Sequence, residues 1–270
     1  MKKTVIAGLL AVLLAACEKD LELDYHTVSP IYVCEALLTP NGLSARLSRT
    51  QDMSVGAAAS DYVDRATVVI RQTGSKWTDT LVYSGSGIYR LDYAGEPGHD
   101  YTLDVLLDGR RYSSASTMLG QPVVTSFRFV WQDIVSERIL FAELCLDDLP
   151  DENNYYFMHL YRNGVGYRWA VMTDRQNPGQ ELRQLFTCFS RRQMDEGTDS
   201  DVLLRGDRLR MEVRSIDRRC YDYLYSLQLM EGSGTNPIAN FSGGLLGYFS
   251  AYQESVVETV FDADAIDGPE

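Results

Sequence analysis

Histidines and serines are the first candidates for catalytic or metal chemistry in this chain. Its 3 histidines, His26, His99 and His159, are far apart, and no two have the short spacing typical of zinc ligands. A hydrolase serine is expected in Gly-x-Ser-x-Gly, and the chain lacks that motif. Ser86 lies between two glycines, which is typical of a hairpin turn. We therefore predict no catalytic residue, no enzymatic activity, no cofactor and no metal site.

Two acidic loops, residues 147–154 and 195–201, carry carboxylates of the kind that Ca²⁺ prefers. Calcium takes about six to eight oxygen ligands, and the EF-hand supplies them at the spacing Asp-x-Asp-x-Asp-Gly. Neither loop has that spacing. We therefore interpret both loops as solvated turns.

Cys17 has a chemistry that its neighbours define. It follows Leu14-Ala15-Ala16, which closes an apolar run that begins at Val5, behind Lys2 and Lys3. This layout is typical of a secretory signal, and the run is shorter than the ~20 apolar residues that a bilayer span needs. A cysteine directly after the cut predicts a bacterial lipoprotein signal: residues 1–16 are removed, and Cys17 carries acyl chains such as palmitate.

The residues after Cys17 predict the side of the membrane. Glu18-Lys19-Asp20 resemble the surface-export signal of Bacteroidetes lipoproteins, which sends the anchor to the outer leaflet. Residues 17–29 are polar and aperiodic, so we expect a lipidated tether. The formal net charge of −13 argues against nucleic acid and against docking on an anionic membrane face. We expect a protein anchored by lipid in the outer membrane and facing the cell exterior.

The chain has 5 cysteines, and those besides Cys17 could form disulfides in an oxidising compartment. Cys34 lies in an apolar, strand-like run, and we expect a buried free thiol there. Cys145, Cys188 and Cys220 have neither CxxC nor zinc spacing. If a bridge forms, we expect it to join two of these three, and our choice is Cys188 with Cys220.

The elements that must position these residues are mainly strands. Alternating apolar residues predict seven short strands between Ile31 and Thr117, with hairpin turns at Asn41-Gly42 and Asp108-Gly109. Strands at this spacing are typical of a sandwich of immunoglobulin or transthyretin type, here over residues 30–119. No helix is needed in this part of the chain.

A second domain is predicted over residues 123–270, after a boundary at Gly120-Gln121-Pro122. Its one good helix, near residues 217–231, is indicated by apolar residues at helical spacing and by Asp217 or Ser215 as a cap. The expected fold is mostly β: an N-terminal immunoglobulin/transthyretin-like β-sandwich and a second mainly β domain with one α-helix. Strands of this second domain are predicted over residues 125–132, 138–147, 155–162, 167–172, 208–215 and within 251–261.

A glycine-rich, aromatic segment is the first place to look for a ligand. Its glycines allow tight turns or a close approach between backbones, and its aromatics could stack on a ligand. We favour the alternative, a bulged core strand whose glycines relieve crowding. The residues of this segment that would contact a ligand are Gly243, Gly244, Gly247, Tyr248, Phe249 and Tyr252.

Three motifs, in this order, resemble one family. With the Cys-Glu-Lys-Asp start, they resemble the Bacteroidetes lipoprotein family known as domain of unknown function 4249 over nearly the whole mature chain. The resemblance implies a β-sandwich and a second, mostly β domain, in proteins encoded beside TonB-dependent outer-membrane transporters, and it implies no activity. The motifs are Gly95-Glu96-Pro97-Gly98-His99-Asp100-Tyr101-Thr102-Leu103, Ser215-Ile216-Asp217 with Tyr221-Asp222-Tyr223-Leu224, and Asn240-Phe241-Ser242-Gly243-Gly244-Leu245-Leu246-Gly247-Tyr248-Phe249.

Three functions stay open at this point. The favoured one is a non-catalytic binding or accessory module that helps a TonB-dependent transporter capture a nutrient, whether a small ligand, a glycan or a peptide. The second is a structural or adhesive surface lipoprotein. The third is a hydrolase without a recognisable motif, which converging acids or histidines of perturbed pKa would favour.

Overall fold

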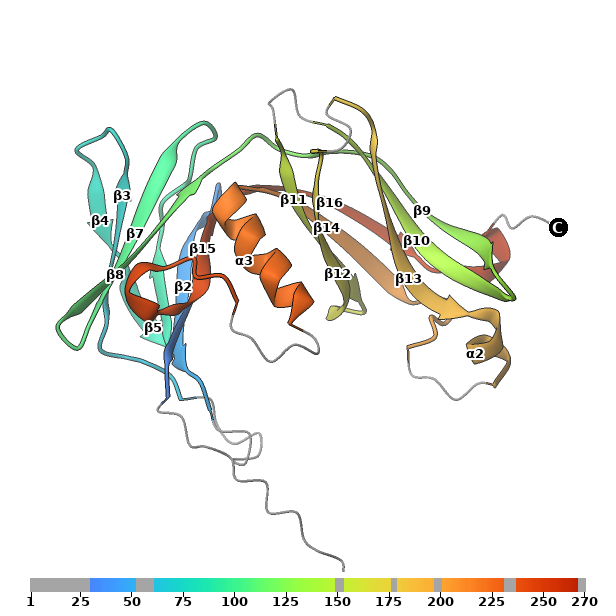
Figure 1. Ribbon diagram of the computed structural model, residues 1–270, viewed down its shortest axis with the longest axis horizontal. Helices are drawn as coiled ribbons and strands as arrows, with labels where there is room; N and C mark the ends of the chain where they lie inside the picture. Colours follow the sequence, from blue (N-terminus) through green and yellow to red (C-terminus); the bar gives the residue numbers. More distant parts are fainter. Residues whose placement is uncertain are drawn as a thin grey trace, which may run out of the picture.

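The computed structural model describes residues 30–51, 61–148, 153–175, 179–196, 201–230 and 237–266. Within these ranges the chain is mostly β, and the predicted fold class is confirmed. Two units of paired sheets flank helix α3 (Arg218–Leu229), as Figure 1 shows. No helix within the same ranges is long and apolar enough to cross a membrane. The lipidation site Cys17 and the tether lie outside the described residues.

The N-terminal unit packs two sheets around one core. Sheet A has the strand order β15-β1-β2-β6-β5, and sheet B has the order β4-β3-β7-β8. Leu43, Ala45 and Leu47 are buried in this core because a strand turns every second side chain to the same face. The strands are β1 (Tyr32–Thr39), β2 (Gly42–Arg49), β3 (Thr67–Gln72), β4 (Thr78–Thr80), β5 (Val82–Gly85), β6 (Ile88–Leu91), β7 (Asp100–Leu107), β8 (Arg110–Thr117) and β15 (Leu246–Ala251).

One of the seven strands predicted between Ile31 and Thr117, over residues 78–83, is divided in the structure. The buried Leu81 separates β4 of sheet B from β5 of sheet A, so the chain changes sheets at this residue. Both predicted hairpins form, but the first turn consists of Pro40 and Asn41 rather than Asn41 and Gly42, because Gly42 already pairs with Thr39. β1 and β2 pair as far as Thr39 and Gly42, and the turn between β7 and β8 has positive φ at Asp108 (50°) and Gly109 (71°), as a type I′ turn requires.

Strand β15 comes from the far end of the sequence and completes the N-terminal unit. It pairs in parallel with β1, so that Cys34 lies opposite Gly247. Its Phe249 and Ala251 lie in the core between sheets A and B. The predicted boundary at residues 120–122 assigns this segment to the second domain. The chain instead leaves the first unit after β8 and returns to it at Phe241.

The second unit also consists of two sheets. Sheet C has the order β13-β10-β9, and sheet D has the order β12-β11-β14-β16. Leu144, Met158 and Met211 belong to the separate core between them. All the strands predicted for this half of the chain form. The bounds are β9 (Val123–Ile134), β10 (Glu137–Asp147), β11 (Tyr155–Arg162), β12 (Val165–Thr173), β13 (Leu182–Ser190), β14 (Arg208–Ile216) and β16 (Gln253–Val260).

Helix α3 forms where the sequence predicts it and joins the two units. Oδ1 of Asp217 accepts hydrogen bonds from the backbone N–H groups of Arg219 (2.8 Å) and Cys220 (3.1 Å), which caps the start of the helix. The buried face of α3 carries Cys220, Tyr223 and Leu224. These side chains form a third hydrophobic cluster with residues of β1, β11, β12, β14 and β15.

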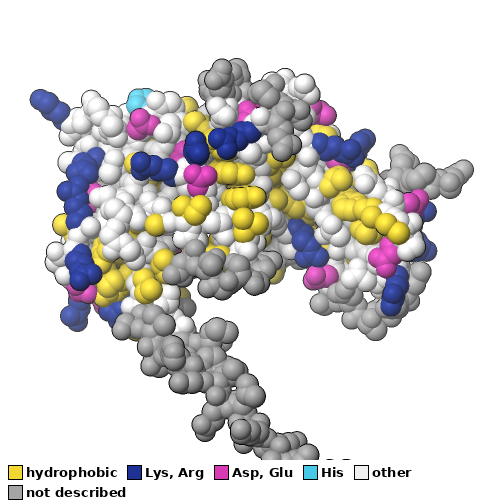
Figure 2. Space-filling view, viewed as in Figure 1, with side chains coloured by type: hydrophobic (Ala, Val, Ile, Leu, Met, Phe, Trp, Pro, Cys, Tyr) yellow, Lys and Arg dark blue, Asp and Glu magenta, His cyan; other side chains and the backbone are white. Residues whose placement is uncertain are grey.

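Another face of α3 keeps hydrophobic side chains at the surface. Tyr225 is 44% exposed and Leu229 is 60% exposed. Tyr221 stacks on Tyr225, with ring centroids 5.6 Å apart. Figure 2 shows hydrophobic side chains gathered over α3, in the middle of this view of the molecule.

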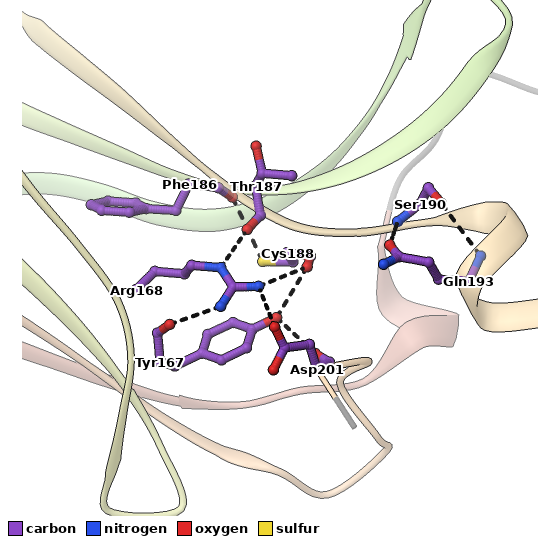
Figure 3. Close-up of polar contacts among 8 residues, drawn as sticks. All are labelled: Tyr167, Arg168, Phe186, Thr187, Cys188, Ser190, Gln193 and Asp201. Carbon is purple, nitrogen blue, oxygen red and sulfur yellow. Dashed lines mark hydrogen bonds and ion pairs between the residues drawn. The ribbon is translucent and has the colours of Figure 1, made fainter. Parts of the chain in front are cut away.

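The sequence did not predict β13 or the short helix α2 (Arg191–Glu196). The register between β10 and β13 shifts between Leu140 and Phe141, so the apolar residues of β13 lack a regular alternation. Helix α2 begins with a reciprocal cap. The backbone N–H of Gln193 donates to Oγ of Ser190 (3.3 Å), and the backbone N–H of Ser190 donates to Oε1 of Gln193 (2.7 Å; Figure 3).

Candidate functional site

Sheet D has one face in the second core and one face outside it. Met158 and Leu160 of β11 point into the core, so the alternate residues Phe157, His159 and Tyr161 lie on the other face. β14 contributes to that outer face because His159 pairs with Glu212. We call it the sheet-D face and define it by Phe157, His159, Tyr161, Trp169, Arg210, Glu212, Arg214, Glu254 and Glu258.

An ion network fixes the centre of the sheet-D face. Glu212 is 4% exposed, and its Oε2 accepts a hydrogen bond from Nη1 of Arg210 at 2.5 Å. Its Oε1 accepts one from Nε of Arg214, also at 2.5 Å. The Arg214 guanidinium carbon lies 4.4 Å from the ring centroid of Tyr252 and 5.3 Å from that of Phe157. Both oxygens of Glu212 are thus held by arginines, which compensates its buried charge.

Burial and this network shift the pKa values of three groups. Burial alone would raise the pKa of Glu212, but the charge of Arg214 and the hydrogen bond from Arg210 outweigh it, and the pKa is lowered. The pKa of Glu254 is raised by burial and by its hydrogen bond to Glu212. Burial lowers the pKa of His159, which keeps the imidazole neutral at pH 7.

The rings of β11 form a row along the sheet-D face. The ring centroids of His159 and Tyr161 are 4.0 Å apart, and Phe157 meets His159 edge-on at 5.9 Å. Gly166 leaves room for the imidazole, since a Cβ at this position would lie 2.8 Å from Nε2 of His159. Tyr161 and Trp169 are half-buried, so parts of both rings are accessible to a ligand.

The sheet-D face continues into a pocket at the β11–β12 hairpin. This pocket has a volume of about 880 Å³, and Tyr161, Arg208 and Arg210 are among its lining residues. A second pocket of about 430 Å³ lies against sheet A and is lined by residues that include Leu37 and Tyr252. Because Tyr252 also packs against the arginine network, it connects the sheet-D face with sheet A.

The glycines of the predicted ligand segment have two different surroundings. Gly247 has φ +94°, and a Cβ there would lie 2.0 Å from the carbonyl oxygen of Cys34. This glycine therefore permits the close approach between β15 and β1. Gly243 and Gly244 lie in the exposed turn η1 (Ser242–Gly244), and both have positive φ.

The aromatics of the same segment point inward. Phe249 is fully buried in the core of the N-terminal unit. Tyr248 stacks on Tyr223 of α3, with ring centroids 5.3 Å apart. Tyr252 is 4% exposed and packs against the guanidinium of Arg214 on the sheet-D face. The segment is thus arranged as a core strand with a close backbone approach.

All cysteines in the described part of the chain are buried free thiols. Cys34, which was expected to be one, lies in the core of the N-terminal unit. The predicted bridge between Cys188 and Cys220 is wrong, because Cys188 lies in the second core and Cys220 lies under α3. Burial raises the pKa of Cys188 to about 11, which leaves this thiol protonated and unreactive.

The remaining residues considered for catalysis are scattered. Ser86 has φ 49° and lies in the turn between β5 and β6, as predicted. His99 lies just before β7, with Nδ1 3.9 Å from Oε2 of Glu96. His26 lies outside the described residues. In the described ranges, no group of 3 or more His, Cys, Asp or Glu side chains is arranged to hold a metal ion.

Arg168 of β12, in sheet D, hydrogen-bonds to the backbone of β13, in sheet C, as Figure 3 shows. Its guanidinium donates to the backbone oxygens of Thr187 (3.0 Å), Tyr167 (2.9 Å) and Cys188 (3.4 Å). It also forms an ion pair with Asp201 at 3.0 Å. The side chain thus satisfies carbonyl groups along β13 that a neighbouring strand would otherwise satisfy. We assign this cluster a structural role.

Replacing Arg168 with methionine is expected to destabilise the protein by about 1–3 kcal/mol, because the carbonyls of Thr187 and Cys188 each lose a charged hydrogen-bond donor and Asp201 loses its ion pair. Methionine retains an apolar stem, so the change isolates the guanidinium. Urea unfolding followed by tryptophan fluorescence measures the effect. Arg205→Met is the control, since Arg205 is 63% exposed and forms surface ion pairs with Asp262 and Asp264. Equal losses in the two variants would contradict the role assigned to Arg168.

The alternation of residue types along two strands already marks the sheet-D face in the sequence. Alternation along residues 155–162 places Phe157, His159 and Tyr161 on one side of β11. Alternation along residues 208–215 places Leu209, Met211 and Val213 on one face and leaves the charged residues between them on the opposite side. The sequence does not show that these two rows belong to adjacent strands, which is what makes them one site.

Comparisons with known proteins identify one family and distant structural likenesses. A model of the family described as a domain of unknown function (DUF4249) matches residues 18–257. No curated protein matches the chain. A segment of two fibronectin type III domains from chicken tenascin is similar at 14% identity and a TM-score of 0.24, over 85% of this chain and 99% of that one. The FN1–FN3 domains of chicken CNTN1 are similar at 10% identity and a TM-score of 0.22, over 83% of this chain and 67% of that one.

Proposed function

The chain belongs to the family described as a domain of unknown function (DUF4249), and from that premise we propose that it is a non-catalytic binding module of the outer membrane. In this proposal it is a Bacteroidetes-type lipoprotein anchored through Cys17, and Glu18-Lys19-Asp20 direct it to the cell exterior. It helps a TonB-dependent transporter capture a nutrient. The nutrient binds at the sheet-D face.

The sheet-D face is the observation that carries the proposal. The half-buried ring of Tyr161 lies beside the fixed charge of Arg210 and lines an open pocket of about 880 Å³, and the half-buried Trp169 lies on the same face. Pockets that combine apolar walls with a few placed polar groups are the usual ligand sites of proteins. The exposed hydrophobic row on α3, Tyr225 and Leu229, supports contact with a protein partner, because such patches mark interaction surfaces.

One observation favours an enzyme instead. Glu212 and Glu254 are neighbouring carboxyl groups whose pKa values shift in opposite directions, as in acid–base pairs of hydrolases. Both oxygens of Glu212 accept hydrogen bonds from arginines, however, and the residue is 4% exposed, so a substrate has little access to this carboxylate. We therefore place binding ahead of catalysis.

The test uses the full-length lipoprotein with a C-terminal affinity tag, in cells grown on the nutrient that induces it. Cross-linking, purification from outer membranes and mass spectrometry are expected to recover a TonB-dependent transporter. Cys17→Ala removes the lipidated residue, so this variant is expected to leave the membrane fraction and to lose the transporter. A wild-type purification without a transporter would count against the partnership.

The same cells test the sheet-D face. Tyr161→Ala is expected to slow growth on limiting nutrient while the transporter still co-purifies, because the variant removes a ligand contact and leaves the anchor. Tyr83→Ala is the matched control, since Tyr83 is a 44% exposed tyrosine on β5, away from this face. Normal growth of Tyr161→Ala, together with lost surface attachment in a deletion strain, would favour the adhesive alternative.

A further inference from the structure

We propose that the loop end of the second unit holds a calcium ion between Asp148, Asp174 and Asn154. Asp148 directly follows β10, and Asn154 directly precedes β11. Asp174 directly follows β12, whose last residue Thr173 pairs with Tyr155 at the start of β11. The ends of three strands therefore bring two carboxylates and one amide together. This site is separate from the sheet-D face and does not depend on the function proposed for that face.

Two carboxylates converge on a single side-chain amide. Nδ2 of Asn154 donates to Oδ1 of Asp148 at 3.2 Å and to Oδ2 of Asp174 at 3.2 Å. The backbone holds the same arrangement, because the N–H of Asp174 donates to the carbonyl oxygen of Asn154 at 3.3 Å. Asp148 is fixed further by hydrogen bonds from the hydroxyl of Tyr156 (3.2 Å) and the N–H of Gly179 (2.6 Å).

Asp174 is the unusual member of this group. It is 1% exposed, and its second oxygen, Oδ1, is buried without a hydrogen-bond partner. In the described part of the chain, neither Asp174 nor Asp148 forms an ion pair with an arginine, lysine or histidine. A buried carboxylate without a countercharge costs several kcal/mol, and a second carboxylate nearby adds repulsion. A bound cation removes both costs.

The donors are those of a hard cation. The oxygen and nitrogen of an asparagine amide exchange places by a half-turn of the side chain. In the presence of a cation, this half-turn replaces the Asn154 N–H donors with Oδ1, which then joins the carboxylate oxygens of Asp148 and Asp174. An all-oxygen set of this kind suits Ca²⁺, with water completing about six to eight ligands. Because calcium affinity falls with the number of charged ligands, we expect two carboxylates to bind in the weak range of extracellular modules, about 10⁻⁴–10⁻³ M.

This arrangement revises the interpretation of residues 147–154 as a solvated turn. A solvated carboxylate keeps its oxygens in water, whereas Asp174 has almost no exposed surface. The spacing of acids within a single loop does not reveal this site. Asp174 lies outside both acidic loops, at the end of β12, so the pairing across sheet D was not visible in the sequence.

Terbium luminescence on the full chain tests the site. Tb³⁺ substitutes for Ca²⁺, and Tyr156, whose hydroxyl contacts Asp148, is placed to sensitise its emission when excited at the tyrosine absorption band. We expect saturable emission that millimolar Ca²⁺ displaces. Asp174→Asn is expected to weaken Tb³⁺ binding at least tenfold. Asp79→Asn is the control, because Asp79 is an exposed acid on β4, and this variant is expected to bind as wild type does.

Thermal unfolding gives a second readout that a purely structural role would not move. Calcium at 10 mM is expected to raise the Tm of the wild type and of Asp79→Asn, relative to EDTA, and to leave the Tm of Asp174→Asn unchanged. Asp148→Asn removes the less buried carboxylate of the site, and its Tm is likewise expected not to rise with calcium. Absence of tyrosine-sensitised emission, or an equal calcium shift in wild type and Asp174→Asn, would overturn the proposal.

Discussion

Replacing Gly247 with alanine is expected to destabilise the protein by about 3–5 kcal/mol, the larger part from a collision between two backbones. An alanine Cβ would lie 2.0 Å from the carbonyl oxygen of Cys34 and 3.0 Å from its backbone nitrogen. These are backbone atoms of β1, which no side-chain rotation can move. In addition, φ is +94° at this position, which is strained for any residue with a Cβ. Relief therefore requires β15 to separate from β1.

Urea unfolding measures this loss, and thiol labelling locates it. Cys34 is fully buried and pairs with Gly247, so separation of β15 from β1 is expected to make this thiol react faster with an alkylating reagent. Gly244→Ala is the matched control. Gly244 also has positive φ (+87°), but nothing lies within 4 Å of an added Cβ, so only the backbone strain of about 1–2 kcal/mol applies. Similar losses in both variants would show that the close approach is unimportant.

The pairing of β15 with β1 also marks what local sequence patterns can and cannot predict. Asn41-Gly42 and Asp108-Gly109 predict their hairpins because both strands of a hairpin are neighbours in the sequence. The parallel pair β1–β15 joins residues more than 200 positions apart, and no local signal records such a contact. The three glycines near residue 245 indicated crowding, and the structure identifies the crowding partner of Gly247 as the backbone of Cys34.

The candidate site was hidden for the same reason. The alternation that places Leu209, Met211 and Val213 on one face of the strand predicted over residues 208–215 also fixes where Arg210 and Glu212 must point. What the sequence omits is the order β11-β14-β16, which sets His159 beside Glu212 and brings Glu254 to the same face. A lone histidine in a predicted strand therefore had no visible partner.

Glu212→Gln is expected to cost about 3–5 kcal/mol of folding free energy at pH 7, because it leaves buried arginine charge uncompensated. Arg214 is 13% exposed and packs between Tyr252 and Phe157, so it cannot turn to solvent without disturbing the junction of the two units. Glutamine keeps the size of the side chain and removes its charge, so the loss reports the ion network. Urea unfolding at pH 7, monitored by tryptophan fluorescence, measures it.

Glu254→Gln is the matched control, and pH distinguishes the two acids. The pKa of Glu212 is lowered, so its stabilisation is complete above its ordinary pKa of 4.5 and is lost as pH falls through the lower folded value. The pKa of Glu254 is raised, so its contribution is present below pH 4.5 and is lost as pH rises through the higher folded value. Glutamine mimics the protonated acid, so Glu254→Gln is expected to be at least as stable as wild type at pH 7. A loss at pH 7 as large as that of Glu212→Gln would contradict this assignment of charge on the sheet-D face.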